Sequence, residues 1–215
     1  LGISYLKAIN KINPNIKAVT IKRTNNYLDT LSDEEIVSAS NIRERFYRNE
    51  DVRKYTPCYQ NLVKIDYNLY FKILKSKIMT VNKLDEYLDV SEGIDNLLEK
   101  VILECNSLEE LIKKLKTKRY TYNRLNRMFL HILFNIKKDQ KYDINYIRVL
   151  GFNLKRRLYL KTIKDDLDTL IITNYKDIDD EVLKIERRIT ILYLQIIKRE
   201  DLIKEELKSI PIKIN

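Results

Sequence analysis

Residues 116–127 combine side chains that bind anions with nothing that would neutralise them. The stretch holds five cations, two tyrosines and no acid. It runs into apolar residues spaced by three and four over 125–136, which predicts a helix with one buried face. Thr121 is placed to cap this helix, so Lys118 and Arg119 precede an N-terminus whose dipole disfavours cations. The pattern favours an external anion, but a solvated basic surface would explain the same residues.

The distribution of charge supports a polyanionic partner. The chain carries a net charge of +10 over 215 residues, and residues 111–165 contain 16 Lys and Arg against three acids. Residues 85–110 run the other way, with nine acids and one lysine. Because tyrosine and asparagine are interleaved with the cations, nucleic acid fits better than a membrane surface. The alternative is that Arg119, Arg124 and Arg127 pair with the acidic segment inside the fold.

Composition excludes several other classes of protein. The chain is 44% hydrophobic and 33% charged, which is typical of a folded soluble domain, and no apolar run is long enough to cross a bilayer. Cys58 and Cys105 are far apart, which favours reduced thiols and a cytoplasmic location over a disulfide framework. With one histidine, His131, a zinc site is not expected, and His131 itself is interpreted as a helix-face residue.

A second group of residues could hold phosphate. Ser38 and Ser40 stand just before an amphipathic stretch that contains Arg43. A helix that starts here would present backbone N–H groups and hydroxyls, and Arg43, one turn later, could reach the same anion. An ordinary serine N-cap is the competing interpretation, and these residues alone favour it.

Hydrophobic periodicity predicts a mainly α fold with small α/β parts. We expect helices at 2–13, 61–78, 82–89, 93–105, 107–116, 121–137, 153–164 and 178–199, and strands at 17–23, 146–150 and 167–173. The alternation of strand and helix after 141 predicts a small parallel βαβα unit, and the tail after 204 is expected to be loose. The sequence predicts three domains, at residues 1–54, 55–140 and 141–215. The second of them is a helical module with a basic face.

Several motifs resemble the bacterial tRNA(Met) cytidine acetate ligases. The matching segments are 1–9, 20–23, 38–43, 91–96, 117–121 and 146–153. The most specific are Lys-Arg-Tyr-Thr at 118–121 and Arg-Val-Leu-Gly-Phe-Asn at 148–153. Ser-x-Ser-x-Ile-Arg at 38–43 is shared more widely among nucleotidyltransferases. The resemblance implies that residues 1–54 are the later part of a Rossmann-like nucleotidyltransferase domain.

The resemblance also implies an activity. The family activates acetate with ATP as acetyl-adenylate, and the acetyl group then passes to the exocyclic amine of the wobble cytidine in elongator tRNA(Met). ATP with Mg²⁺ and acetate are therefore the expected small molecules, tRNA is the expected partner, and no membrane or obligate protein partner is implied. The expected nucleotide-binding residues are Gly2, Lys22, Arg23, Ser38, Ser40 and Arg43. The expected RNA-binding residues are Lys116, Lys118, Arg119, Arg124, Arg127, Lys155, Arg156 and Arg157.

The chain departs from the family pattern in ways that bear on catalysis. The phosphate-binding His-x-Gly-His segment is absent and is expected upstream of Leu1, where the catalytic groups would lie. Ala39 stands where many nucleotidyltransferases have serine, and the glycine expected shortly after Asn153 is missing. We therefore expect a fragment that is inactive alone. A non-catalytic RNA-binding module with a vestigial nucleotide site is the alternative, while a nucleotidyltransferase for a small acceptor would not need so basic a surface.

Overall fold

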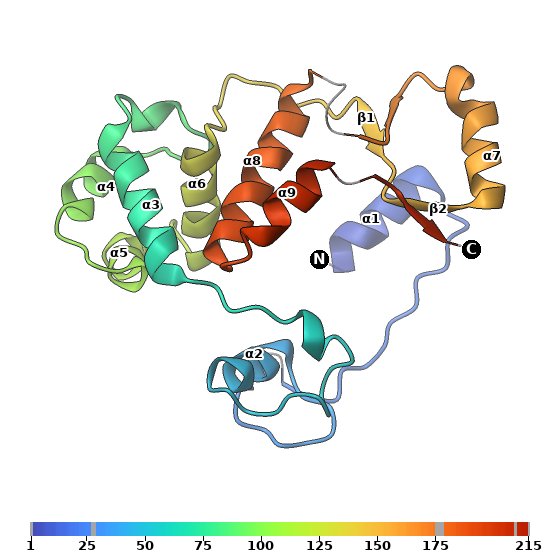
Figure 1. Cartoon of the computed structure of the whole chain (residues 1–215). Coiled ribbons are helices and arrows are strands. Elements are labelled where there is room, and N and C mark those ends of the chain that lie inside the picture. The colour runs from blue at the N-terminus through green and yellow to red at the C-terminus, as the bar shows by residue number, and fades with distance from the viewer. Residues whose placement is uncertain (1, 27–28, 175–178, 209, 215) are drawn as a thin grey trace. The chain divides into compact units, whose positions relative to one another are not determined.

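The computed structural model describes residues 2–26, 29–174, 179–208 and 210–214 (Figure 1). The chain forms two compact units, unit 1 (Leu1–Lys64) and unit 2 (Ile65–Asn215). The predicted three-domain division, with boundaries near 54 and 140, stays a prediction. Among the described residues, no helix is both long and apolar enough to cross a membrane.

Among its described residues, unit 1 has two α-helices, and residues 13–26 and 29–38 between them form no helix or strand. Helix α1 (Gly2–Ile12) buries none of its residues, α2 is Ala39–Tyr47, and the short 3-10 helix η1 (Tyr59–Asn61) comes later. Val52 is the one apolar side chain that is buried among the described residues of this unit. Polar contacts hold the segment around α2 together.

The prediction of a strand at residues 17–23 is wrong. These residues have no regular structure and are exposed, with Val19 at 78% and Ile21 at 95% of full exposure. A strand needs a neighbour to satisfy its backbone N–H and C=O groups. The described residues of unit 1 contain no other strand, so the β-branched residues at 17–23 have nothing to pair with.

The helical module predicted after residue 61 lies in unit 2. It contains α3 (Tyr67–Thr80), the 3-10 helix η2 (Leu84–Glu86), α4 (Ile94–Ile102), α5 (Leu108–Leu115) and α6 (Tyr122–Phe134). Their apolar faces form one core, in which Leu74, Leu98, Leu111, Leu125 and Phe129 are completely buried. The predicted periodicities of these helices are the ones that face this core.

Side-chain caps fix where these helices begin. Asp66, Ser107 and Thr121 each accept a hydrogen bond from the backbone N–H three residues later, at 2.9, 3.1 and 3.4 Å. Helix α3 therefore begins at 67 rather than 61. The helix predicted at 82–89 is wrong beyond its 3-10 turn, because Asp89 has φ +67°, which a right-handed helix cannot contain.

The rest of unit 2 pairs short strands with helices. The elements are β1 (Tyr146–Arg148), β2 (Gly151–Asn153), α7 (Leu154–Ile163), η3 (Lys164–Asp166), β3 (Leu170–Ile172), α8 (Glu181–Ile196), α9 (Asp201–Lys208) and β4 (Ile212–Ile214). Strand β1 pairs in parallel with β3 across α7, as the βαβα prediction requires. Helix α8 contacts α3 and α6, and its Leu183 packs with Tyr146 and Ile172.

The prediction of a loose tail after residue 204 is wrong, because the C-terminal residues form α9 and then β4. Strand β4 pairs in parallel with β2, an element about 60 residues earlier in the chain (Figure 1). A Cβ atom on Gly151 would lie 3.2 Å from the backbone oxygen of Ile212, so the missing side chain lets the two strands approach. The second sheet places Pro211 and Lys213 beside α7, where they line one groove together with residues of that helix.

Candidate nucleic-acid interface and nucleotide site

The residues predicted to hold phosphate gather at the start of α2. Ser38 caps the helix: its Oγ accepts from the Asn41 backbone N–H at 3.0 Å and donates to the Asp29 carbonyl at 2.6 Å. Ser38 is only 2% exposed, so both its hydrogen-bonding roles are used inside the fold. Ser40 and Arg43 lie nearer to solvent, and Arg43 Nη2 donates to Ser40 Oγ at 3.2 Å.

Arg23 is connected to the same region through one asparagine. Its Nε donates to the Asn25 side-chain oxygen at 2.7 Å and to the Asn25 carbonyl at 3.1 Å. Asn25 Nδ2 in turn donates to the carbonyl of Ile36, two residues before Ser38, at 2.9 Å. This chain of bonds links Arg23 to the backbone of the segment that precedes α2. Gly2 and Lys22 are exposed and lie outside it.

Arg45, which the sequence interpretation missed, organises this part of unit 1. Its guanidinium donates to Asn41 Oδ1 at 2.7 Å and to the Ser32 carbonyl at 3.1 Å, and it pairs with Asp33 and Glu50 at 3.2 and 3.1 Å. These contacts tie the segment before α2 to the helix and to the segment that follows it. The spacing of four between Asn41 and Arg45 was the available signal, since such residues share a helix face.

Asp33 is a second junction in this network. Hydrogen bonds from Tyr55 and from Lys54 lower the pKa of the Asp33 carboxyl below its ordinary value. The Arg45 guanidinium lies 5.1 Å from the centre of the Tyr55 ring. The Asp33 carboxylate therefore holds Tyr55 and Arg45 in place within unit 1.

In unit 2, the basic segment (residues 116–127) is divided between solvent and the fold. Tyr120 is buried, and its hydroxyl donates to the Ser91 carbonyl at 2.6 Å. Arg124 lies over the Tyr120 ring, 4.1 Å from its centre, and donates to Ser91 Oγ at 3.0 Å. Tyr122, by contrast, is 53% exposed. Tyr120 and Arg124 thus hold the loop that precedes α4.

That loop, residues 88–93, also supplies the acids that pair with the basic segment. Arg119 lies 3.0 Å from Glu92, and Arg127 lies 3.5 Å from Asp89. Both arginine side chains stay largely exposed, at 77% and 65%, so each pair is worth little and leaves the cation accessible. Arg119 and Arg127 therefore pair with the acidic segment inside the fold, as the alternative interpretation of the sequence proposed. This pairing does not prevent either arginine from contacting RNA as well.

His131 contacts the same acidic loop. Its Nδ1 lies 3.1 Å from the Leu88 carbonyl and 3.4 Å from Asp89. These contacts fit the interpretation of His131 as a helix-face residue. Lys116 and Lys118 differ from the arginines: in the described part of the chain neither has an acidic partner, and both are exposed.

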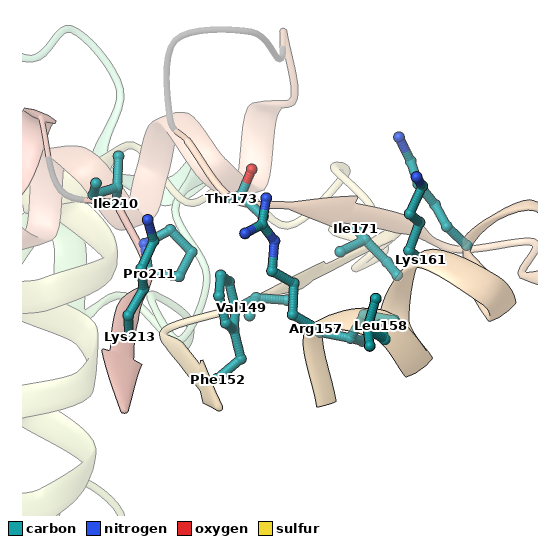
Figure 2. Close-up of a pocket in the computed structure, with 12 residues that line it drawn as sticks. Val149, Phe152, Arg157, Leu158, Lys161, Ile171, Thr173, Ile210, Pro211 and Lys213 are labelled. Atoms are coloured by element: carbon teal, nitrogen blue, oxygen red, sulfur yellow. The ribbon is translucent and has the colours of Figure 1, made fainter. Parts of the chain in front are cut away.

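The third predicted group lies on α7, beside a groove of about 680 Å³. Asn153 caps this helix by accepting from the Arg156 backbone N–H at 2.9 Å. Arg157 lines the groove, whereas Lys155 and Arg156 do not. In the view of Figure 2, the Arg157 side chain lies between those of Lys213 and Lys161. The three adjacent cations are therefore not equivalent.

Comparison with known proteins now fixes the family. The chain matches the HIGH Nucleotidyl Transferase family over residues 1–208. It belongs to that family. The motif resemblance to tRNA(Met) cytidine acetate ligases is confirmed as well, because curated proteins of that name are similar over most of this chain.

Three such relatives illustrate the similarity. A tRNA(Met) cytidine acetate ligase from Oceanobacillus iheyensis is 34% identical over 97% of this chain and 58% of its own length. The protein of that name from Clostridium perfringens strain SM101 is 40% identical over 90% of this chain and 52% of its own length. The one from Bacillus anthracis strain CDC 684 is 32% identical, with coverages of 99% and 61%. This member of the HIGH family thus spans little more than half the length of these relatives.

Solved structures show the same fold. The apo crystal structure of Thermotoga maritima TmcAL superposes with a TM-score of 0.73 at 21% identity, covering 100% of this chain and 59% of that one. A second crystal form of TmcAL, bound with alpha-thio ATP, gives a TM-score of 0.71 and covers 99% and 58%. The mainly helical nucleotidyltransferase-like fold predicted from the sequence is therefore confirmed.

Proposed function

We propose that this chain is part of an ATP-dependent ligase that acetylates the wobble cytidine of elongator tRNA(Met). The observation that carries the proposal is the 32–40% identity to tRNA(Met) cytidine acetate ligases over 90–99% of the chain. ATP as a substrate is supported by the family and by the ATP-analogue complex of TmcAL. Acetate is the proposed co-substrate, and Mg²⁺ would accompany ATP.

The proposed reaction has two steps. A carboxylate oxygen of acetate attacks the α-phosphorus of ATP, which forms acetyl-adenylate and releases pyrophosphate. The exocyclic amine of the cytidine then attacks the acetyl carbon, AMP leaves, and the amine loses a proton. Both steps depend on positioning and on cations that stabilise charge on the phosphates.

In unit 1, Ser40, Arg43 and Arg23 are the proposed phosphate contacts. Ser40 and Arg43 lie in the first turn and a half of α2, whose backbone N–H groups and dipole favour an anion. Ser38 has a positioning role, because its hydroxyl is already committed to the cap. Gly2 and Lys22 stay predicted contacts with no observed link to this group.

The 215 residues are proposed to lack activity alone. With a single histidine, the chain cannot contain the His-x-Gly-His pattern that its family uses to bind phosphate. The exposed cations of the basic segment and of α7 would instead hold tRNA. Lys116, Lys118, Arg119 and Arg127 are suited to its phosphates because their side chains are exposed.

A chimera tests the proposal. Residues 1–215 replace the aligned region of the C. perfringens ligase, and acetylcytidine in tRNA(Met) is measured by mass spectrometry with ATP and acetate present. We expect acetylation by the chimera and no acetate-dependent ATP–pyrophosphate exchange by the 215-residue chain. If the chimera binds tRNA(Met) and folds but does not acetylate it, the chain is better described as a non-catalytic RNA-binding module.

A further inference from the structure

The lining of the groove beside α7 combines charged and apolar side chains. Its cations, called the rim cations, are Arg157 and Lys161 from α7, Lys164 from η3 and Lys213 from β4, and Thr173 adds a hydroxyl. Its apolar lining, called the floor, consists of Val149, Phe152, Leu158, Leu160, Ile171, Ile210 and Pro211. Figure 2 shows Lys161 and Lys213 at opposite sides of the view, with Arg157 between them.

Among the described residues, the four rim cations have no acidic partner. Across the part of the chain that the structure describes, none of Arg157, Lys161, Lys164 and Lys213 forms an ion pair or a side-chain hydrogen bond, and no acid lines the groove. The neighbouring cavity contains Glu206, but that carboxylate is paired with Arg148 at 2.7 Å. Four like charges around one groove repel one another, and a bound polyanion would relieve that repulsion.

The apolar floor indicates that the ligand has an apolar part as well as phosphate groups. A phosphate-only ligand would leave Phe152 and the surrounding aliphatic side chains without a partner. A nucleobase has a flat apolar face, and bases commonly stack on aromatic side chains in proteins that bind single strands. Phe152 is partly buried and is the aromatic residue of the groove lining.

We infer that this groove binds an unpaired nucleotide of RNA. The base lies on the floor formed by Phe152, and the flanking phosphates contact the rim cations. The inference rests on the proposed function only in taking RNA as the partner. A duplex presents stacked bases that cannot enter a concave site, whereas a single strand can. Rim cations from three separate elements match successive phosphates better than the single phosphate group of a free mononucleotide.

The test measures binding of the whole 215-residue chain to labelled RNA by fluorescence anisotropy. The probes are a single strand of about five nucleotides and a blunt duplex of about 16 base pairs, the lengths that single-strand and duplex sites typically cover. Phe152→Leu keeps an apolar side chain and removes the ring. Arg157→Gln removes a rim cation, and Arg156→Gln removes the same charge from the next position on α7, outside the groove.

We expect Phe152→Leu to weaken single-strand binding about 10-fold without changing its salt dependence. Arg157→Gln should weaken it more than Arg156→Gln and lower the slope of log affinity against log salt by about 0.7, the value for one phosphate contact. Duplex binding should respond equally to the two arginine variants. Thermal melting, monitored by circular dichroism, establishes whether each variant is folded. If Phe152→Leu does not fold, the comparison of Arg157→Gln with Arg156→Gln tests the inference by itself.

Four results would overturn the inference, and they separate it from the proposed function. Equal losses for Arg156→Gln and Arg157→Gln with the single strand would mean that α7 is a general basic surface. Displacement of the single strand by ATP at equal concentration would mean a mononucleotide site. If the chain binds tRNA(Met) and neither Phe152→Leu nor Arg157→Gln changes the affinity for RNA, the groove is not the binding site, but the proposed role in holding tRNA stands. If no RNA binds, the proposed role in holding tRNA fails with it.

Discussion

At the scale of single residues, Arg124 illustrates why a basic stretch has to be divided before it is tested. It was predicted to bind RNA together with Arg119 and Arg127. Its guanidinium packs on the Tyr120 ring at 4.1 Å and donates to Ser91 Oγ at 3.0 Å, so it also holds the loop before α4. Loss of RNA binding on changing Arg124 could therefore report a moved loop rather than a lost phosphate contact.

We predict that Arg124→Ala lowers the free energy of unfolding by about 2–4 kcal/mol, the sum expected for one cation–π contact and one charged hydrogen bond. Lys118→Ala should leave that free energy nearly unchanged, because Lys118 is exposed and has no acidic partner in the described part of the chain. Urea denaturation of both variants measures the difference. Equal stabilities would show that the Arg124 contacts do not matter to the fold.

At the scale of elements, local signals predicted helices α5 and α6 of unit 2 well. Helices α5 and α6 begin where Ser107 and Thr121 cap them, and both the caps and the apolar periodicity can be read within a dozen residues. Strand β4 was missed because its partner, β2, is about 60 residues away and no local pattern records that pairing. The strand predicted at 17–23 failed for the converse reason, since propensity without a partner makes no strand.

The candidate sites divide in the same way. The sequence located the cations and the Ser38–Arg43 cluster, because residue type and spacing are local properties. It could not tell that Ser38 is committed to its cap, or that Arg157 faces a groove while Arg156 does not. The groove itself depends on β4, so the missed strand also hid the site.

The start of α3 provides a pH-dependent test of one element. Asp66 accepts from the Leu69 backbone N–H at 2.9 Å and pairs with Lys198 at 3.0 Å, close after the end of α8. The cap, followed by the contact with Lys198, lowers the pKa of Asp66 below its ordinary value of 3.8. A carboxyl with a lowered folded pKa stabilises the protein above its unfolded pKa, and this contribution is lost as the pH falls through the folded value.

We therefore predict that Asp66→Ala is less stable than the unmodified chain at pH 6 and that the difference shrinks as the pH falls below about 4. Asp66→Asn keeps a good capping side chain and loses only the ion pair, so it should lie between the two at pH 6. Thermal melting across this pH range measures all three proteins. A difference that is independent of pH would show that the Asp66 charge contributes nothing.

At the scale of the whole molecule, the two units differ in how they are stabilised. Unit 2 has a continuous apolar core drawn from α3, α4, α5 and α6, with many side chains completely buried. The described residues of unit 1 bury one apolar side chain, Val52, and otherwise rely on hydrogen bonds and ion pairs around Asn41 and Arg45. Because apolar burial is the main favourable term in folding, the units should differ widely in their resistance to unfolding.

Limited proteolysis should expose this difference. Lys17, Lys22 and Arg23 are exposed and lie in an irregular segment, which is the kind of backbone that trypsin cleaves first. We predict early cuts at these residues, followed by survival of a fragment that begins near Ile65 and keeps the helical circular dichroism of unit 2. Mass spectrometry of the time course identifies the fragments. Cleavage within α4 or α5 before cleavage in unit 1 would contradict this order, because it would mean that the buried core opens more readily than a segment held by polar contacts.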